Sequence, residues 1–173
     1  MKIAVEHNIQ GVDTALKQAP DLLMLHVTQF LKRGASEVTR EAKREAPKAF
    51  TTLAQAIHYR RVGAKNSGEF IVYAGTSYAA YVEEGRKPGG KPPPRWMIEA
   101  WINVGSGIKP QNPDMDSRDL AYVISRSIAK KGTKPRPFMA PALDKKTDRL
   151  TQLVRQGIIE GLQAVTNLGA VKR

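Results

Sequence analysis

The hydrophobic residues of this chain follow helical spacing in two long segments, one in each half of the sequence. From Leu23 to Ala46 apolar residues recur three or four positions apart, and Pro47 ends the pattern. The same spacing returns between Ala142 and Val165. The sequence therefore predicts two long amphipathic helices. The apolar stripe of the second helix comprises Leu143, Leu150, Leu153, Val154, Ile158, Leu162 and Val165.

Proline and glycine divide the region of the first helix. Residues 11–17 predict a short separate helix, and Pro20 is expected to start the long one, because proline suits a first helical turn. Before it, residues 2–9 alternate weakly and predict either a strand or an extended arm. Gly34 lies inside the long helix, where glycine costs about 1 kcal/mol relative to alanine. It marks a close backbone contact or a slight bend.

Between the two helices the spacing changes to one that is typical of strands. Ile57–Val62 alternates apolar and polar residues, and Glu69–Ala74 is rich in β-branched and aromatic residues. The turn-forming residues 64–68 between them predict an antiparallel hairpin, to which residues 78–82 are expected to add a third strand. Residues 50–55 fit neither pattern. Because so small a sheet needs cover, we predict an α+β fold with a small antiparallel sheet packed against two long helices.

Residues 86–132 differ in composition from their neighbours and form an insert. Its first part, 86–94, holds three cations and no acid among prolines and glycines, and predicts an extended or mobile loop. The sequence leaves three roles open for this loop, which are contact with DNA phosphates, docking on a partner and exposure to solvent. Helical spacing follows over 95–104, with Trp96 outside the apolar face, and again from a capped start at Asp116 to Gly132. We predict a single domain over residues 1–173, with this helical insert and a basic tail at 167–173.

Composition narrows the class of protein. A chain of 173 residues, 41% hydrophobic and 25% charged, is typical of one folded domain. No apolar run approaches the ~20 residues that span a bilayer, and the first residues lack the apolar segment of a signal peptide. We therefore expect no membrane partner and folding in the cytoplasm. The absence of cysteine excludes disulfides and thiolate chemistry, and the net charge of +12 favours polyanionic partners.

The sequence offers no catalytic or metal-binding pattern. His7, His26 and His58 lie far apart without ligand spacing, and no phosphate-binding glycine loop or nucleophile motif occurs. On a strand, Glu83 and Glu84 would point to opposite faces, which disfavours a carboxylate pair acting on one substrate. We predict that the protein is not an enzyme and that it has no catalytic, cofactor or metal site.

Three motifs occur in order along the chain. The first is the helix end at Ala46 and Pro47, and the third is Arg136, Pro137 and Phe138, followed by a proline in the predicted first turn of the last helix. The second runs from Gly75 to Gly85 and contains Tyr78, Ala79, Tyr81, Val82 and Glu83.

With these motifs the sequence resembles the small tail-component family of long-tailed bacteriophages, whose members complete the tail or join head to tail. Two features depart from the family pattern. Residues 48–53 stand where the family commonly carries an Asp-Thr-Gly turn, and the insert has no counterpart in the shortest members.

The resemblance implies a virion structural protein at the head-tail junction or tail end, made in the host cytoplasm and assembled as a ring of sixfold symmetry. Its neighbours would be the head-tail connector and the tail tube or tail terminator. Glu83 is interpreted as the partner of an arginine across a subunit contact. The candidate contact residues are Tyr78, Tyr81, Glu83, Arg86, Lys87, Lys91, Trp96, Arg136, Pro137 and Phe138.

The positive charge leaves two partners open. It would line a lumen through which DNA passes, or it would meet an acidic neighbouring protein. The alternative function is a sequence-independent nucleic-acid-binding protein, which the charge favours and which the spread of cations over several segments disfavours.

Overall fold

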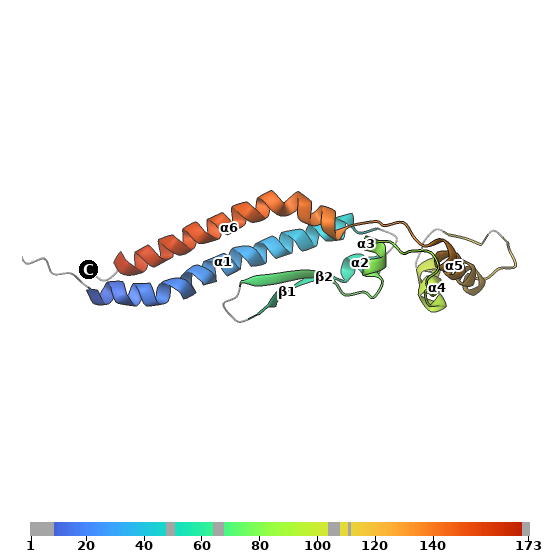
Figure 1. Ribbon diagram of the computed structural model, residues 1–173, viewed down its shortest axis with the longest axis horizontal. Helices are drawn as coiled ribbons and strands as arrows, with labels where there is room; N and C mark the ends of the chain where they lie inside the picture. The colour runs from blue at the N-terminus through green and yellow to red at the C-terminus, as the bar shows by residue number, and fades with distance from the viewer. Residues whose placement is uncertain (1–8, 48–50, 64–67, 104–107, 111, 171–173) are drawn as a thin grey trace, which may run out of the picture. The chain divides into compact units, whose positions relative to one another are not determined.

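The computed structural model describes residues 9–47, 51–63, 68–103, 108–110 and 112–170 (Figure 1). Predictions for residues 2–8, for 64–67 of the turn and for the end of the tail at 171–173 fall outside these ranges. Within these ranges the chain is mostly helical with one two-stranded sheet, and the predicted α+β class is confirmed. The elements are α1 (Ile9–Glu45), α2 (Thr51–Gln55), β1 (Ile57–Val62), β2 (Glu69–Ala74), α3 (Ala79–Glu83), α4 (Arg95–Asn103), α5 (Ser117–Lys131) and α6 (Met139–Ala170).

The chain divides into two compact units. The first contains Met1–Thr39, Tyr59–Val72 and Lys145–Arg173, and the second contains Arg40–His58 and Tyr73–Asp144. Both long helices contribute to each unit. The single domain expected from the sequence stays a prediction.

In the first unit, α1 and α6 lie side by side and run in opposite directions (Figure 1). Gly34 of α1 faces Leu150 of α6, while Gly161 near the other end of α6 faces Leu23. At Gly157 a Cβ atom would lie 3.1 Å from the Cα atom of Val27. Glycine on the facing sides therefore lets the two helices approach closely, and the predicted close contact at Gly34 is confirmed.

The β1–β2 hairpin packs on a neighbouring face of α1. Gly68, which precedes β2 and has φ +62°, lies against Met24, Thr28 and Leu31. These three α1 residues recur at helical spacing beside the stripe that faces α6. Within the first unit α1 is therefore covered by α6 on one face and by the hairpin on another, as the predicted packing of long helix on sheet requires.

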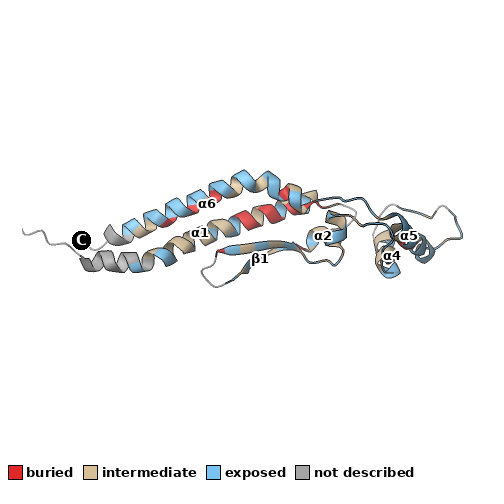
Figure 2. Ribbon diagram, viewed as in Figure 1, coloured by how far each residue is buried: buried red, intermediate tan, exposed pale blue. Residues whose placement is uncertain are grey.

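The core of the second unit combines segments that are distant in sequence. The buried residues are shown in red in Figure 2. Those of the second unit are Ala42, Ala46, Leu53, Ile57, Ala121, Ser125, Phe138 and Ala142. They lie on or directly beside α1, α2, β1, α5 and the beginning of α6.

The predicted helix restart at Pro20 is wrong, because α1 continues through this proline. A proline inside a helix removes one backbone hydrogen bond and costs roughly 3 kcal/mol. Three residues later Leu23 packs against Gly161 of α6. Tertiary packing along α1 therefore outweighs the local preference for a break.

The predicted third strand over residues 78–82 is also wrong, because this segment forms the short helix α3. Its hydrogen bonds are local: the amide of Val82 donates to the carbonyl of Tyr78 (3.2 Å), and that of Glu84 to the carbonyl of Ala80 (2.9 Å). Five residues are too few to distinguish a period of 2 from one of 3.6. The sheet therefore has two strands within the described residues.

The predicted apolar stripe of α6 is correct only in part. Leu153 is buried, as expected, but Leu143, Ile158 and Leu162 are exposed. The stripe predicted from apolar residues missed the two glycines that carry the contact with α1.

The predicted insert forms as expected over the described residues. Residues 86–94 form no helix and only an isolated bridge, and α4 and α5 occupy the predicted helical segments. Asp116 caps α5 by accepting a hydrogen bond from the amide of Asp119 at 2.8 Å. Gly132 ends this helix with φ +72°.

Candidate interaction site

The second and third sequence motifs meet in the second unit, where α3 lies against the start of α6. The carboxylate of Glu83 accepts three backbone hydrogen bonds from the first residues of that helix. Oε2 receives the amides of Phe138 (2.7 Å) and Met139 (3.0 Å), and Oε1 receives that of Ala140 (3.0 Å). Amides at a helix start have no partner within the helix. Glu83 therefore caps α6 from 55 residues away in sequence.

The electrostatics of this cap favour an ionised carboxylate. Burial by itself would raise the pKa of Glu83, but the hydrogen bonds from Met139, Phe138 and Ala140 together outweigh burial and lower this pKa. The negative charge also meets the positive end of the α6 dipole. Glu83 thus has partners within its own chain, which gives it a different role from the predicted pairing with an arginine of another subunit.

Backbone contacts hold the two motifs together beside the cap. The amide of Arg136 donates to the carbonyl of Val82 at 2.8 Å, and Arg86 and Thr133 form an antiparallel bridge with two bonds of 2.9 Å. Gly85 lies between Val82 and Arg86 in sequence and has φ +74°, and a Cβ atom there would lie 2.6 Å from the carbonyl oxygen of Thr133. Glycine is required at this position for both reasons.

Several predicted contact residues are engaged within the chain. Phe138 is only 1% exposed, so its assignment as a partner contact is wrong: the ring belongs to the core. The hydroxyl group of Tyr78 lies 2.7 Å from that of Thr52. The guanidinium of Arg86 lies 5.2 Å from the centre of the Tyr81 ring and donates to the carbonyl of Lys91.

The other predicted contact residues are accessible. Trp96 is 69% exposed, so it is not buried against its own domain. The remaining exposed candidates are Tyr81, Lys87, Lys91, Arg136 and Pro137. Their role in contacts stays a prediction.

One cluster on the insert, around Tyr122 of α5, was not predicted from the sequence. The guanidinium carbon of Arg95 lies 4.2 Å from the centre of the Tyr122 ring, and that of Arg126 lies 5.7 Å from it. Nη1 of Arg126 donates to the tyrosine hydroxyl at 2.8 Å. This bond, with the charges of Arg126 and Arg95, lowers the pKa of Tyr122. Spacing of four residues on a helix signals the Tyr122–Arg126 pair, but no local pattern signals Arg95.

The hydrogen bonds of Glu83 join α3 to the start of α6. Among the described residues, no cluster of three or more His, Cys, Asp or Glu side chains is arranged to hold a metal ion. None of the described helices is long and apolar enough to cross a membrane.

Comparison with known proteins finds a family match for residues 12–85. Residues 12–85 match the family model described as "Bacteriophage HK97-gp10, putative tail-component". This part of the chain is similar to the tail-component family of long-tailed phages. No curated protein and no solved structure matches the chain.

The family match covers the first two motifs and ends at Gly85, where the insert begins. The third motif lies outside it, yet the structure joins that motif to the second through Glu83 and Arg136. The tail-component family supports a structural role in the virion. The resemblance inferred from the motifs is confirmed.

Proposed function

We propose that this tail component acts at the head-tail junction or at the tail end, where copies of the chain form a ring that completes the tail or joins it to the head. The family match over residues 12–85 carries the proposal. A ring would use heterologous contacts, in which one surface of a copy meets a different surface of the next. Sixfold symmetry follows from the resemblance to tail-completion proteins.

Exposed apolar residues on α6 support self-assembly. Ile158, Ile159 and Leu162 are 40%, 54% and 52% exposed. Successive helical residues are about 100° apart, so these three share one side of α6, centred about 130° around the helix from the buried Gly157 and Gly161. Exposed apolar clusters of this kind mark protein contacts. We call Ile158, Ile159 and Leu162 the α6 apolar patch.

The same proposal gives the protein its neighbours. One face of the ring would meet the head-tail connector and the other the tail tube or tail terminator. Tyr81, Lys87 and Trp96 are exposed and would contribute contacts there. Tryptophan and tyrosine are enriched where binding energy concentrates, which supports their assignment.

The ring is tested by measuring mass in solution with light scattering over a range of protein and salt concentrations. We expect a discrete closed oligomer, and Ile159→Asp should dissociate it, because a charge would replace an apolar contact. Gln156→Asp adds the same charge to an exposed position outside the patch and should leave the oligomer intact. A wild-type protein that stays monomeric throughout would contradict a self-assembled ring.

A further inference from the structure

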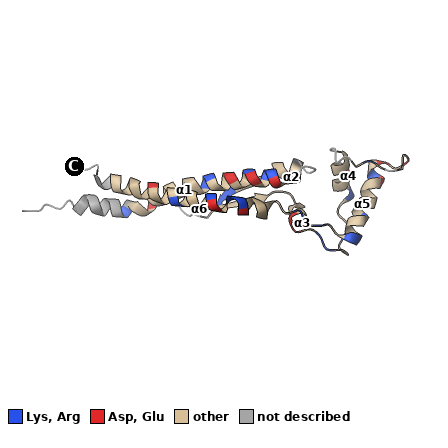
Figure 3. Ribbon diagram, turned by 90° about the horizontal axis from the view of Figure 1, so that it is seen from above, with Lys and Arg blue, Asp and Glu red and all other residues tan. Residues whose placement is uncertain are grey.

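Several cations of the long helices form ion pairs with acids. On α1, Arg33 pairs with Glu37 at 3.4 Å and Arg44 pairs with Glu41 at 3.5 Å. Both signs of charge accordingly stand side by side along this helix in Figure 3. Seven of the nine Lys and Arg residues of the insert lie in residues 86–95 and 120–131, and none of these seven forms an ion pair within the described part of the chain. We call them the basic strip: Arg86, Lys87, Lys91, Arg95, Arg126, Lys130 and Lys131.

Backbone contacts bring the two halves of the basic strip together. The amide of Gly89 donates to the carbonyl of Ala129 at 2.8 Å, and the hydroxyl of Ser125 donates to the carbonyl of Pro93 at 2.6 Å. From the first of these contacts to the second, the residue numbers rise in the loop and fall in α5, so the loop runs antiparallel to the helix. Its cations therefore lie beside those of α5.

No acid interrupts the strip. Residues 86–95 contain four Lys or Arg and no Asp or Glu, and residues 120–131 contain three and none. The acids of α5, Asp116 and Asp119, are at its first turn, where they form the cap. Like charges gathered without compensation repel one another, and a bound polyanion relieves that repulsion.

The cluster around Tyr122 is the most specific part of the strip. Lys130 and Lys131 occupy the last turn of α5, where cations suit the helix dipole without any ligand. Arg95 and Arg126 have no such explanation. Tyr122 holds both guanidinium groups against one exposed ring, Arg95 over its face and Arg126 by its hydroxyl. Guanidinium groups oriented in advance lose less freedom when they bind phosphate.

We propose that the basic strip binds the phosphate backbone of nucleic acid, without sequence preference. The absence of acids from the strip, the orientation of its arginines by Tyr122 and its length along a loop and a helix fit a linear polyanion better than an acidic protein surface. Trp96, next to Arg95, is 69% exposed and offers a ring on which an unpaired base can stack. A single copy of the chain suffices, so this inference does not depend on the proposed ring.

The test is the binding of a labelled duplex DNA of arbitrary sequence, followed by fluorescence anisotropy from about 50 to 200 mM salt. We expect Arg95→Gln/Arg126→Gln to weaken binding about tenfold at the low-salt end and to reduce the slope of log K against log salt by about 2. Both residues are exposed, so the variant should keep its fold, which circular dichroism and thermal melting check. Arg33→Gln/Arg44→Gln removes the same charge from paired positions on α1 and is the matched control.

Each outcome of this test either supports or overturns the proposal. Strip-specific loss of DNA affinity, with the control close to wild type, supports the inference. An equal loss of DNA affinity in both variants would assign binding to net charge alone. Absence of duplex binding at low salt would exclude the strip as a DNA contact. Either result overturns the proposal. Polyglutamate and unlabelled DNA are compared as competitors at equal charge concentration. If polyglutamate displaces the labelled duplex equally well, the strip would instead be assigned to binding an acidic protein. Since binding and mass are measured separately, failure here is distinguishable from failure of the ring.

Discussion

Replacing Glu83 by glutamine tests whether the charge of this cap stabilises the protein. The substitution keeps the size and one carbonyl oxygen of the side chain, but it removes the negative charge that accepts the amides of Phe138, Met139 and Ala140. It thereby weakens the contact between α3 and the start of α6. The backbone contacts between Arg136 and Val82 are left in place.

The expected loss follows from the three hydrogen bonds. A hydrogen bond to a charged group contributes about 1.5–3 kcal/mol, and one between neutral groups about 1 kcal/mol. Because the three bonds share one partly exposed carboxylate, their contributions do not add. We expect Glu83→Gln to lower the free energy of unfolding by about 2 kcal/mol, close to the upper range for a helix cap. For a chain of this length that shifts the melting temperature by about 4–8 °C.

The assay is thermal unfolding of wild type, Glu83→Gln and Glu84→Gln at several pH values. Glu84 is adjacent and exposed, so its variant removes the same charge without the cap. The pKa of Glu83 is lowered on folding, so the unfolded chain binds more protons in the window below its ordinary value of 4.5. The stabilisation is therefore fully present above that value and is lost as pH falls through the folded pKa. The gap between wild type and Glu83→Gln should narrow from about pH 7 towards about pH 3.

Two results would refute this reasoning. Equal melting temperatures of Glu83→Gln and Glu84→Gln at neutral pH would show that the charge of the cap contributes nothing. A gap between wild type and Glu83→Gln that stays constant across the acidic range would show that the loss does not come from the ionised carboxylate.

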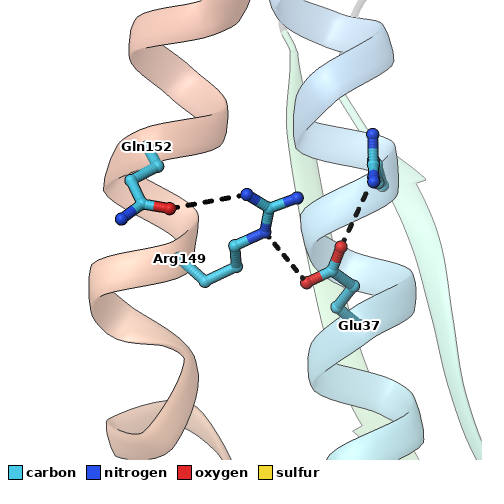
Figure 4. Close-up of polar contacts among 4 residues, drawn as sticks. Glu37, Arg149 and Gln152 are labelled. Carbon is cyan, nitrogen blue, oxygen red and sulfur yellow. Dashed lines mark hydrogen bonds and ion pairs between the residues drawn. The ribbon is translucent and has the colours of Figure 1, made fainter.

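Two further predictions concern the contact between α1 and α6, besides those for the α6 apolar patch and the basic strip. Gly157→Leu should destabilise the protein by about 1–3 kcal/mol in urea unfolding, because the new side chain meets the Cα atom of Val27. Gln156→Leu, at the exposed neighbouring position, should change the free energy of unfolding little. Equal effects of the two substitutions would argue against the close approach of α1 and α6. Arg149→Gln removes a partly exposed ion pair with Glu37, in which the nitrogen and oxygen atoms are 3.6 Å apart (Figure 4). It should lower the free energy of unfolding by less than about 1 kcal/mol, and this effect should shrink as salt is added. A larger loss of stability that does not depend on salt would show that this pair is more than a surface contact.

Periodicity in the sequence predicted most elements because local signals define them. The alternation of Ile57–Val62 and the β-branched run of Glu69–Ala74 predicted both strands with the observed bounds. Asp116 and Gly132 marked the start and end of α5, as capping residues do. The motifs around Tyr81 and Arg136 also indicated the family, because residue types and their spacing are enough to recognise them.

Local signals failed where a segment is too short to show its period and where distant parts of the chain decide the outcome. Residues 78–82 are helical, and Pro20 does not interrupt α1. The glycines of α6 carry no hydrophobic signal, yet α1 approaches α6 closely at Gly157 and Gly161. Contacts between residues far apart in sequence decided the course of α1 and its approach to α6, whereas residues 78–82 are too few to show a helical period.

The sequence by itself determined the charge, the helices and strands with clear periodicity, and the motifs of a phage tail component. Only the tertiary structure showed that Glu83 caps α6, that Phe138 is core, and that Arg95 joins Arg126 around one tyrosine. The physical reason is that a pattern along the chain reports the preferences of neighbouring residues. A cap across 55 positions or a cation held over a distant ring exists only once folding has brought its two halves together.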